Sequence, residues 1–231
     1  MNKDEVLSRL NNDEDYYGEF GQQWLSSSDI GALLSGDPLR FKQSSGPKLA
    51  FVAGSYFHVA ILEPHKLDKF VISKAASRHS KEYKDQANGD ILLLEKDVSK
   101  LKSLIDATLG DMLAYPYIRN DDVQYEQPGY GIIEDLPFKG KADIVNNTMN
   151  LIVDLKTTAD IDSFEEKITQ WNYDSQALVY ETLFEKPFAW VVCCKRSNRI
   201  EVVENNDIYR ESGKAKVKQA AKTYKEWFGK S

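Results

Sequence analysis

The order of the elements in the sequence predicts an α/β core with an α-helical addition at the N-terminus. Apolar residues at helical spacing dominate the first half of the chain, and several β-type runs follow in the second half. A helix, two further strands and a last helix complete the order. With 231 residues, of which 42% are hydrophobic and 29% charged, the chain is typical of a soluble globular protein with one large domain.

The N-terminal elements follow from capping and breaking residues. Residues 1–22 are polar and acidic, and they predict a short helix followed by a loose segment. Ser28 and Asp29 offer an N-cap for a helix whose apolar residues follow at helical spacing, and Gly36-Asp37-Pro38 ends that helix. Ser44-Ser45-Gly46-Pro47 is typical of a turn.

Two longer helices are predicted next, on either side of a charged stretch. Residues 48–63 form the first, because apolar residues recur along the segment until Pro64 breaks the pattern. Residues 66–90 are highly charged and predict an exposed loop with a short helix. Residues 95–114 carry apolar residues along one face and predict a long amphipathic helix.

The second half of the chain predicts the sheet and its covering helices. Strands are expected at 123–126, 129–133, 139–145 and 150–156, a helix at 162–184, strands at 189–195 and 200–203, and a helix at 207–228. Cys193 and Cys194 lie in an apolar strand, which favours a packing role. No repeat or linker divides the chain, so one domain is expected: an N-terminal segment (1–45), a core (46–206) and a C-terminal helix (207–231).

Asp143 and Asp154 stand on the two arms of a predicted β-hairpin. Facing side chains on paired strands lie roughly 5 Å apart. Two carboxylates at such a distance repel each other unless a cation lies between them. Lys156 shares a strand face with Asp154, because side chains alternate with period two. This combination favours Mg²⁺-assisted hydrolysis of a phosphodiester, and the alternative is a surface ion pair at a strand end.

Three further residues are candidates because of their helical spacing. Gln176 and Tyr180 are four residues apart and share a helix face that can point at the hairpin. His58 shares a face with Gly54 in the helix over 48–63. The alternatives are a solvated Gln176 beside a half-buried Tyr180, and a histidine that simply belongs to the core.

Basic residues and the overall charge bear on nucleic-acid binding. Arg78 and Lys81 lie in a predicted loop near the helix of His58 and are candidates for phosphate contacts. The C-terminal lysines surround their helix, which favours a solvated face instead. The net charge of −6 argues mildly against a protein that coats nucleic acid, although a local basic groove can coexist with it.

Several function classes are disfavoured by what the sequence lacks. No apolar window approaches the roughly 18 residues of a membrane helix, and the acidic N-terminus is unlike a signal peptide. A cytoplasmic protein without a membrane partner is therefore expected. The sequence has no phosphate-binding Gly-rich loop, dinucleotide fingerprint or nucleophile elbow, so we expect no consumption of ATP.

Four motifs in this order resemble the PD-(D/E)XK nuclease superfamily. They are Gly54–His58 with Leu62-Glu63-Pro64, Gly140–Asp143, Asp154–Thr158, and Gln176 with Tyr180. More narrowly, the chain resembles the RecE-type, phage-encoded 5′→3′ exodeoxyribonucleases, which share their signature with RecB-type nuclease domains. The resemblance covers residues 46–180 and implies a restriction-endonuclease-like core, with a mixed central β-sheet flanked by helices. Asp154 stands where many members of the superfamily have Glu, as RecE-like members also show.

The resemblance also implies roles for individual residues. By it, His58, Asp143, Asp154 and the carbonyl of Leu155 would bind Mg²⁺, for which Mn²⁺ would substitute. Lys156 would position or activate the attacking water. Gln176 and Tyr180 would support the site or touch the DNA backbone, and Ser28 lies where related exonucleases anchor a 5′-phosphate.

The activity that the resemblance implies is degradation of one strand of linear duplex DNA from its 5′ end, which exposes single strand for recombination. A ring-shaped homo-oligomer, trimer or tetramer, is expected, and so is a single-strand annealing protein as a partner in a phage or its bacterial host. One alternative is a Cas4-like or other single-strand or structure-specific nuclease of the same superfamily. Another alternative is a non-catalytic relic of the fold that binds DNA or protein.

Overall fold

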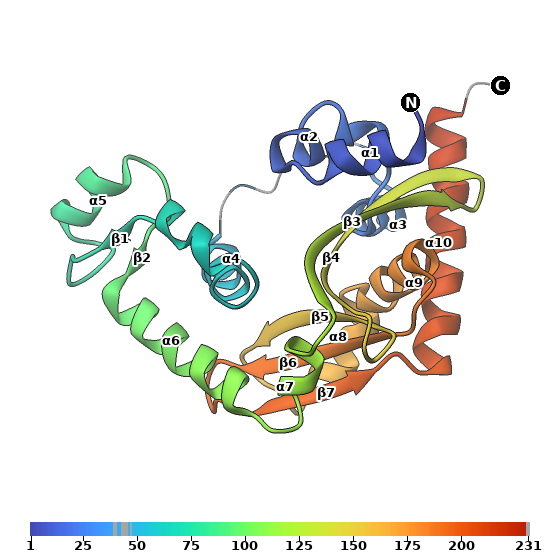
Figure 1. The fold of residues 1–231 in the computed structure, drawn as a ribbon. Helices are drawn as coiled ribbons and strands as arrows, with labels where there is room; N and C mark the ends of the chain where they lie inside the picture. The colour runs from blue at the N-terminus through green and yellow to red at the C-terminus, as the bar shows by residue number, and fades with distance from the viewer. Residues whose placement is uncertain (39–40, 43–45, 47, 230–231) are drawn as a thin grey trace.

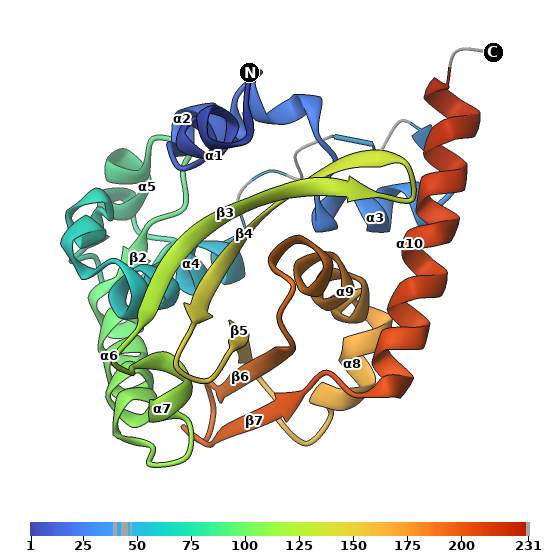
Figure 2. The same ribbon diagram turned by 45° about the vertical axis from the view of Figure 1, so that its right-hand side comes forward.

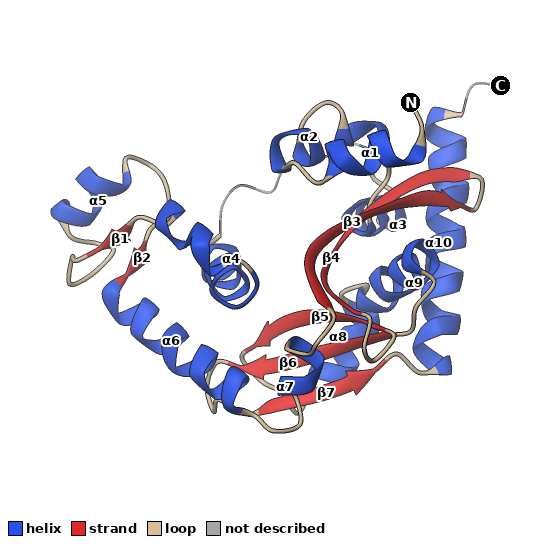
Figure 3. Cartoon of the chain, viewed as in Figure 1, coloured by secondary structure: helices blue, strands red, loops and turns tan. Residues whose placement is uncertain are grey.

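The computed structural model describes the whole chain except residues 39–40, 43–45, 47 and 230–231. Its centre is a five-stranded sheet in the order β3-β4-β5-β6-β7. β5 and β6 run parallel, and every other neighbouring pair is antiparallel. The sheet is therefore mixed. Helices lie on both of its faces, and three short helices precede them in the chain, so the predicted α/β class is confirmed (Figures 1 and 3).

The N-terminal segment contains α1 (Lys3–Leu10), α2 (Asp13–Tyr17), a 3₁₀ turn over Gly21–Gln23, and α3 (Ser27–Leu34). The predicted N-cap of α3 is wrong by two residues. Ser26 is the cap, because its N–H donates to the carboxylate of Asp29 over 2.8 Å, and Ser28 lies inside the first turn. The predicted turn at 44–47 and the boundary at 45/46 lie among or beside residues outside the described part of the chain.

The next segment forms a layer of helices on one face of the sheet. It contains α4 (Leu49–Leu62), a 3₁₀ helix (Pro64–Lys69), α5 (Lys81–Ala87), α6 (Glu95–Gly110) and α7 (Tyr115–Ile118), with the short parallel strands β1 (Ile72–Ser73) and β2 (Leu93–Leu94). α6 ends four residues earlier than predicted. The Asp111 carboxylate accepts the N–H groups of Leu113 and Ala114, which turns the chain there.

β3 (Val123–Ile133) and β4 (Leu136–Asn146) form a long curved hairpin that rises from the rest of the sheet (Figures 1 and 2). The prediction of two separate strands at 123–126 and 129–133 is wrong, because one strand spans both. Glu126 interrupts the pairing with a left-handed backbone (φ 51°), and Pro128 is tolerated because β3 is an edge strand.

β5 (Leu151–Thr158) pairs with β4 for only three residues on each strand. The last of these pairs, counted from the turn, joins Ile144 to Val153. Beyond it the two strands separate, and β5 continues beside β6 (Phe188–Cys194) along its full length. Asp143 and Asp154 are the first residues after this point of separation.

The helix predicted over 162–184 is in fact two helices, α8 (Phe164–Gln170) and α9 (Tyr173–Phe184). The break is at Asn172, whose backbone is left-handed (φ 60°). Asn accepts that conformation more readily than most residues, so the helical periodicity hides the break. β7 (Ile200–Glu204) and α10 (Asp207–Phe228) follow, and α10 has the predicted bounds.

The core lies on both faces of the sheet, because successive residues of β5 and β6 point to opposite sides. Trp190 packs on the side of α8, α9 and α10, whereas Val191 packs on the side of α4 and α6. Cys193 and Cys194 are free and buried within β6. Within the described ranges, no helix combines the length and the apolarity that a bilayer crossing requires.

Candidate active site

Asp154, Lys156 and Gln176 form a closed triangle of polar side chains. The Gln176 amide donates to Asp154 Oδ1 over 2.8 Å and accepts from Lys156 Nζ over 3.0 Å. Lys156 Nζ also lies 2.5 Å from Asp154 Oδ2 as an ion pair. Asp154 and Lys156 meet because alternate residues of β5 share a face, and α9 carries Gln176 across that face.

Asp143 lies where β4 leaves β5 and connects two other elements. Its Oδ2 atom accepts the backbone N–H of Leu155 over 2.9 Å, which takes the place of a strand-to-strand bond. The same oxygen lies 3.2 Å from His58 Nδ1 on α4. The structure therefore brings His58, Asp143, Asp154, Lys156 and Gln176 together from four elements.

Burial of these side chains and the interactions between their charges shift their pKa values. Burial lowers the pKa of Lys156, but the carboxylates of Asp154 and Asp143 outweigh it, and the pKa is raised. The pKa of His58 is raised for the same reason, since Asp143 outweighs its burial. Burial raises the pKa of Asp154, and the nearby charge of Asp143 adds to this. The pKa of Asp143 is lowered, because His58 and Lys156 outweigh its burial.

Glu126 is a residue that the sequence analysis missed. It stands on β3 opposite Asp143, at the interruption of the β3–β4 pairing. Burial, together with the charges of Asp143 and Glu63, raises its pKa to about 7. The sequence offered one indication of Glu126: it is an acidic residue inside a predicted strand, next to Gln127-Pro128, and strand propensity disfavours acidic residues there.

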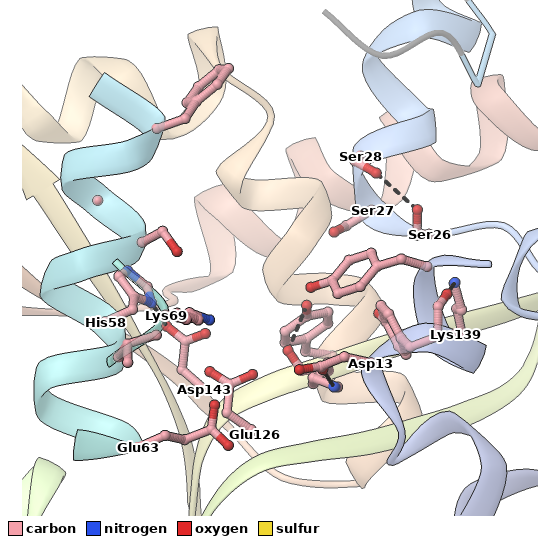
Figure 4. A pocket seen from close by; sticks show the side chains of 18 of the residues that line it. Asp13, Ser26, Ser27, Ser28, His58, Glu63, Lys69, Glu126, Lys139 and Asp143 are labelled. Carbon is pink, nitrogen blue, oxygen red and sulfur yellow. Dashed lines mark hydrogen bonds and ion pairs between the residues drawn. The ribbon is translucent and has the colours of Figure 1, made fainter. Parts of the chain in front are cut away.

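A cleft of about 770 Å³ opens beside these residues, between α4, the β3–β4 hairpin and the N-terminal segment. Figure 4 shows Glu63, Glu126 and Asp143 on its floor beside His58, with Ser26, Ser27 and Ser28 on the opposite wall. Asp154 does not line the cleft, because only 2% of its surface is exposed. The cleft is lined by acidic residues (Asp13, Glu63, Glu126, Asp143), lysines (Lys69, Lys139, Lys141), serines and aromatic rings (Tyr16, Tyr17, Phe51).

Two lysines of β4 are held inside this cleft by the N-terminal segment. Lys141 Nζ lies 2.5 Å from Asp13 Oδ1, and Lys139 donates to the backbone carbonyl of Tyr16. Burial, with Lys42 and Lys141 nearby, lowers the pKa of Lys139 to about 8. The two positive groups therefore lie within a pocket whose floor is negative.

Tyr180 and Gln176 share a face of α9 but make different contacts. The Tyr180 hydroxyl donates to the backbone carbonyl of Lys141 over 3.0 Å, which ties α9 to β4, and it also contacts the side chain of Gln176 where Tyr180 lines the cleft. Its ring lies on Gly140, where a Cβ atom would come within 2.7 Å of it. Gln176 instead contacts Asp154 and Lys156 directly.

The predicted DNA-contacting residues fall in different places. Ser28 lines the cleft, with its hydroxyl 2.9 Å from that of Ser26. Arg78 is not among the lining residues, and its guanidinium donates to Asp97 at the start of α6. Lys81 is exposed at the start of α5, which lies at the far end of the helical layer (Figure 1).

The groups present include carboxylate and carbonyl oxygens, which a hard divalent cation prefers, together with one imidazole, a donor more typical of transition metals. Asp154 Oδ2 is compatible with this fit, since it is a buried carboxylate oxygen that is already held against a positive charge, the ammonium of Lys156. The described residues nevertheless do not hold three His, Cys, Asp or Glu ligands around one point. Lys156 lies against Asp154, and His58 lies against Asp143, so ion binding requires these pairs to open.

Comparisons with known proteins agree with this fold. A solved structure from Eubacterium rectale, provisionally described as an exonuclease, aligns with a TM-score of 0.69 and 18% identity, over 93% of this chain and 85% of the other. A phage-related exonuclease from Haemophilus somnus 129PT aligns with a TM-score of only 0.36 and 14% identity, over 74% of this chain and 93% of the other.

No curated protein matches the chain in sequence. The model of a family described as a PDDEXK-like domain of unknown function (DUF3799) matches residues 38–212. The resemblance to the PD-(D/E)XK superfamily is thereby confirmed, whereas the narrower resemblance to RecE-type proteins stays a prediction. With three quarters of its length covered by that model, and with the mixed sheet and the Asp143, Asp154 and Lys156 constellation in place, the chain belongs to the PDDEXK-like DUF3799 family.

Proposed function

We propose that the protein is a metal-dependent deoxyribonuclease that hydrolyses phosphodiester bonds of DNA. The observation that carries the proposal is the triangle of Asp154, Lys156 and Gln176 beside Asp143 and His58. A stable fold has little use for so many buried charges, because their desolvation opposes folding. Perturbed ionisable groups next to a cleft are typical of catalytic sites.

His58, Asp143, Asp154 and the carbonyl of Leu155 would hold Mg²⁺, or Mn²⁺ in its place. When bound, the ion supplies Lewis acidity toward the phosphodiester and lowers the pKa of water. The chain's own contribution is to fix the donors. Gln176 orients Asp154, and the N–H of Leu155 orients Asp143.

Lys156 is placed to orient the attacking water and to offset charge that develops on the phosphate. Its raised pKa keeps it protonated, which favours this electrostatic role over that of a general base. Gln176 holds the ammonium beside Asp154, and the ring of Tyr173 lies 4.8 Å from it. Both contacts restrict where the ammonium points.

The cleft offers a path for a nucleic-acid strand. Lys139 and Lys141 supply positive charge for the phosphates, and Ser28 lies on the opposite wall. Tyr17 and Phe51 line the cleft with 69% and 58% of their surfaces exposed, so they present faces on which bases stack.

The finer part of the proposal rests on the resemblance to RecE-type exonucleases. It comprises 5′→3′ digestion of one strand of linear duplex ends, action as a ring-shaped homo-oligomer, and work with a single-strand annealing protein in recombination. A Cas4-like enzyme is less favoured, because such proteins usually add a four-cysteine cluster and this chain has two cysteines, both in β6. A non-catalytic relic is disfavoured by the buried Asp154 and Lys156 pair.

The test is digestion of a linear duplex labelled at either the 5′ or the 3′ end, with Mg²⁺ or with a chelator. We expect Mg²⁺-dependent loss of DNA, with the 5′ label released first. Asp154→Ala and Lys156→Ala should each lower the rate at least about 100-fold, because each removes a charged group from the site. Lys84→Ala, at an exposed position of α5, is the control and should retain the rate. Digestion that persists in chelator, or near-wild-type rates in the Asp154 and Lys156 variants, would reject the proposal.

A further inference from the structure

β7 is an edge strand, and no strand in the described part of the chain pairs with its outer side. The flanking hydrogen bonds, from Cys194 N–H to Arg199 and from Asn205 N–H to Phe188, fix which residues face β6. In an antiparallel pair such residues alternate, so the backbone groups of Ile200, Val202 and Glu204 point away from β6. No hydrogen bond joins these outward groups to another described residue.

A groove of about 560 Å³ runs along this strand, and all five residues of β7 line it. One wall comes from the segment after α6, through Asp111 and Leu113. The other wall comes from Glu165 of α8 and from Asn206 and Tyr209 at the start of α10. We name this feature the β7 groove. The outward N–H and C=O groups of β7 run along this groove without partners among the described residues. A sheet edge needs such free groups to accept another strand.

Exposed apolar side chains flank the groove on both walls. The three most exposed large hydrophobic residues of the described chain are Met112, Leu113 and Ile208, at 90%, 80% and 76%. Leu113 lines the groove itself, whereas Met112 and Ile208 are sequence neighbours of lining residues of the first and the second wall. Apolar residues concentrated around one groove mark an interaction surface rather than chance exposure.

The charge of the groove decides what kind of partner fits. Among its lining residues four are acidic, namely Asp111, Glu165, Glu201 and Glu204, and none is Lys or Arg. Arg199 lies at one end, where it pairs with Glu201 and with Asp162 outside the lining. An acidic groove repels the phosphates of nucleic acid. It also disfavours a second copy of the same strand, because the two sets of carboxylates would face each other.

The strand lacks several of the devices that usually keep edges apart, and its protection against self-pairing is the charge of Glu201 and Glu204. Its sequence, Ile-Glu-Val-Val-Glu, contains no Pro and no Lys, and its pairing with β6 has no bulge. The edge is therefore protected against pairing with an acidic strand but stays open to a basic one.

We propose that the β7 groove binds an extended, basic segment of a partner protein, which adds to the sheet as a sixth strand. The backbone of Ile200, Val202 and Glu204 supplies the ladder of hydrogen bonds. Successive side chains of the segment point to opposite faces of the sheet, so its Lys or Arg residues meet Glu204 on one face or Glu201 on the other, and its apolar residues lie on the opposite face. This surface is separate from the cleft, since no residue lines both.

The experiment uses a synthetic peptide of alternating Lys and Val. A matched peptide of alternating Glu and Val tests the charge, and a Lys and Val peptide methylated at every second backbone nitrogen tests the backbone hydrogen bonds. Binding to the full chain is measured by fluorescence anisotropy, and hydrogen exchange reads the outward amides. We expect only the unmodified basic peptide to bind, and to slow exchange at Ile200, Val202 and Glu204. Glu204→Lys should weaken binding about fivefold, as expected for loss of an exposed ion pair and its replacement by repulsion.

Ile208→Ser is a second variant and should also weaken binding, and its exposed position leaves the fold intact. The matched controls are Glu82→Lys on α5 and Ile132→Ser on β3, which are exposed elsewhere and should bind as the wild type does. Absence of binding, equal binding of the methylated peptide, or equal binding by Glu204→Lys and Ile208→Ser would overturn the proposal. A dimer in sedimentation that Ile208→Ser dissociates would overturn it as well, because a second copy would then occupy the groove.

Discussion

Gln176 holds the two charged side chains of the triangle with a single amide group. Replacement by Met keeps the volume and removes both hydrogen bonds. We expect Gln176→Met to lower DNA hydrolysis about 10- to 100-fold, as for other groups that orient metal-binding residues. Steady-state rates at saturating Mg²⁺ check this.

Tyr180→Phe is the companion variant, because the Tyr180 hydroxyl contacts the carbonyl of Lys141 and the side chain of Gln176 rather than Asp154 or Lys156. It should cost about 1 kcal/mol of unfolding free energy and leave the rate nearly unchanged. Equal rate losses in Gln176→Met and Tyr180→Phe would contradict the separate roles that the geometry gives them.

Lys139 makes the stability depend on pH. Its pKa is about 8 in the folded chain, below the ordinary 10.5, so between these values the unfolded chain binds more protons. The free energy of unfolding should therefore rise with pH in this window, by at most about 2 kcal/mol from about pH 7.5 to about pH 9.5 relative to Lys139→Met. Urea denaturation of both proteins at the two pH values measures it. A difference that does not change with pH would show that Lys139 is not destabilised by burial.

At the scale of single residues, much of the triangle was predictable. Strand alternation puts Lys156 beside Asp154, helical spacing made His58 and Gln176 candidates, and the resemblance gave these two their roles. Glu126 was not predictable, because its role follows from a left-handed backbone that Glu seldom adopts and that no local pattern announces.

At the scale of elements, α9 lies unusually close to the β3–β4 hairpin, where glycines remove the side chains between them. Gly129 and Gly140 are direct cross-strand partners, and Cβ atoms there would meet the rings of Phe184 and Tyr180 at 2.7 Å. This close approach brings Gln176 to Asp154. The glycine of the Gly140–Asp143 motif therefore has a packing role.

Gly140→Ala should lower the unfolding free energy by about 1–3 kcal/mol, as overpacking usually does. It should also slow DNA hydrolysis, because α9 must move away with Gln176. Chemical denaturation and rate measurements check both. Gly110→Ala is the control, since nothing lies within 4 Å of a Cβ there, and a loss of stability in Gly110→Ala as large as in Gly140→Ala would refute the explanation.

The elements were predictable where periodicity and breakers agree, as in α4 and α10. They were not predictable where a single residue overrides the period. Asn172 divides one helical pattern into α8 and α9 through its left-handed dihedral angles, and Asp111 ends α6 early through local hydrogen bonds. Neither cause is visible in the pattern of hydrophobic residues.

At the scale of the whole molecule, ion binding and folding are linked, because the proposed ligands come from α4, β4 and β5 and meet only in the folded chain. Mg²⁺ at about 100 times its dissociation constant should add about 2.7 kcal/mol to the free energy of unfolding. Asp154→Asn should lose most of this gain while keeping its fold by circular dichroism. Denaturation with Mg²⁺ and with chelator measures the difference, and an unchanged gain in Asp154→Asn would exclude Asp154 as a ligand.

The cleft is the part of the molecule that sequence reasoning could not supply. Asp13 and Lys141 meet there although 128 positions separate them, and Tyr16 meets Lys139 over a similar interval. No window of the sequence contains both partners. The α/β class, in contrast, follows from the order of the elements alone.

The early parting of β4 from β5 has a mechanical consequence. Asp143 is carried by the curved hairpin and Asp154 by the flat part of the sheet, so bending of the hairpin alters the spacing between the acids. Lys139 and Lys141 lie on the same arm as Asp143, a few residues away. If DNA binds in the cleft as proposed, a force on those lysines would also act on the arm that bears Asp143, so substrate binding would change the spacing between the two acids.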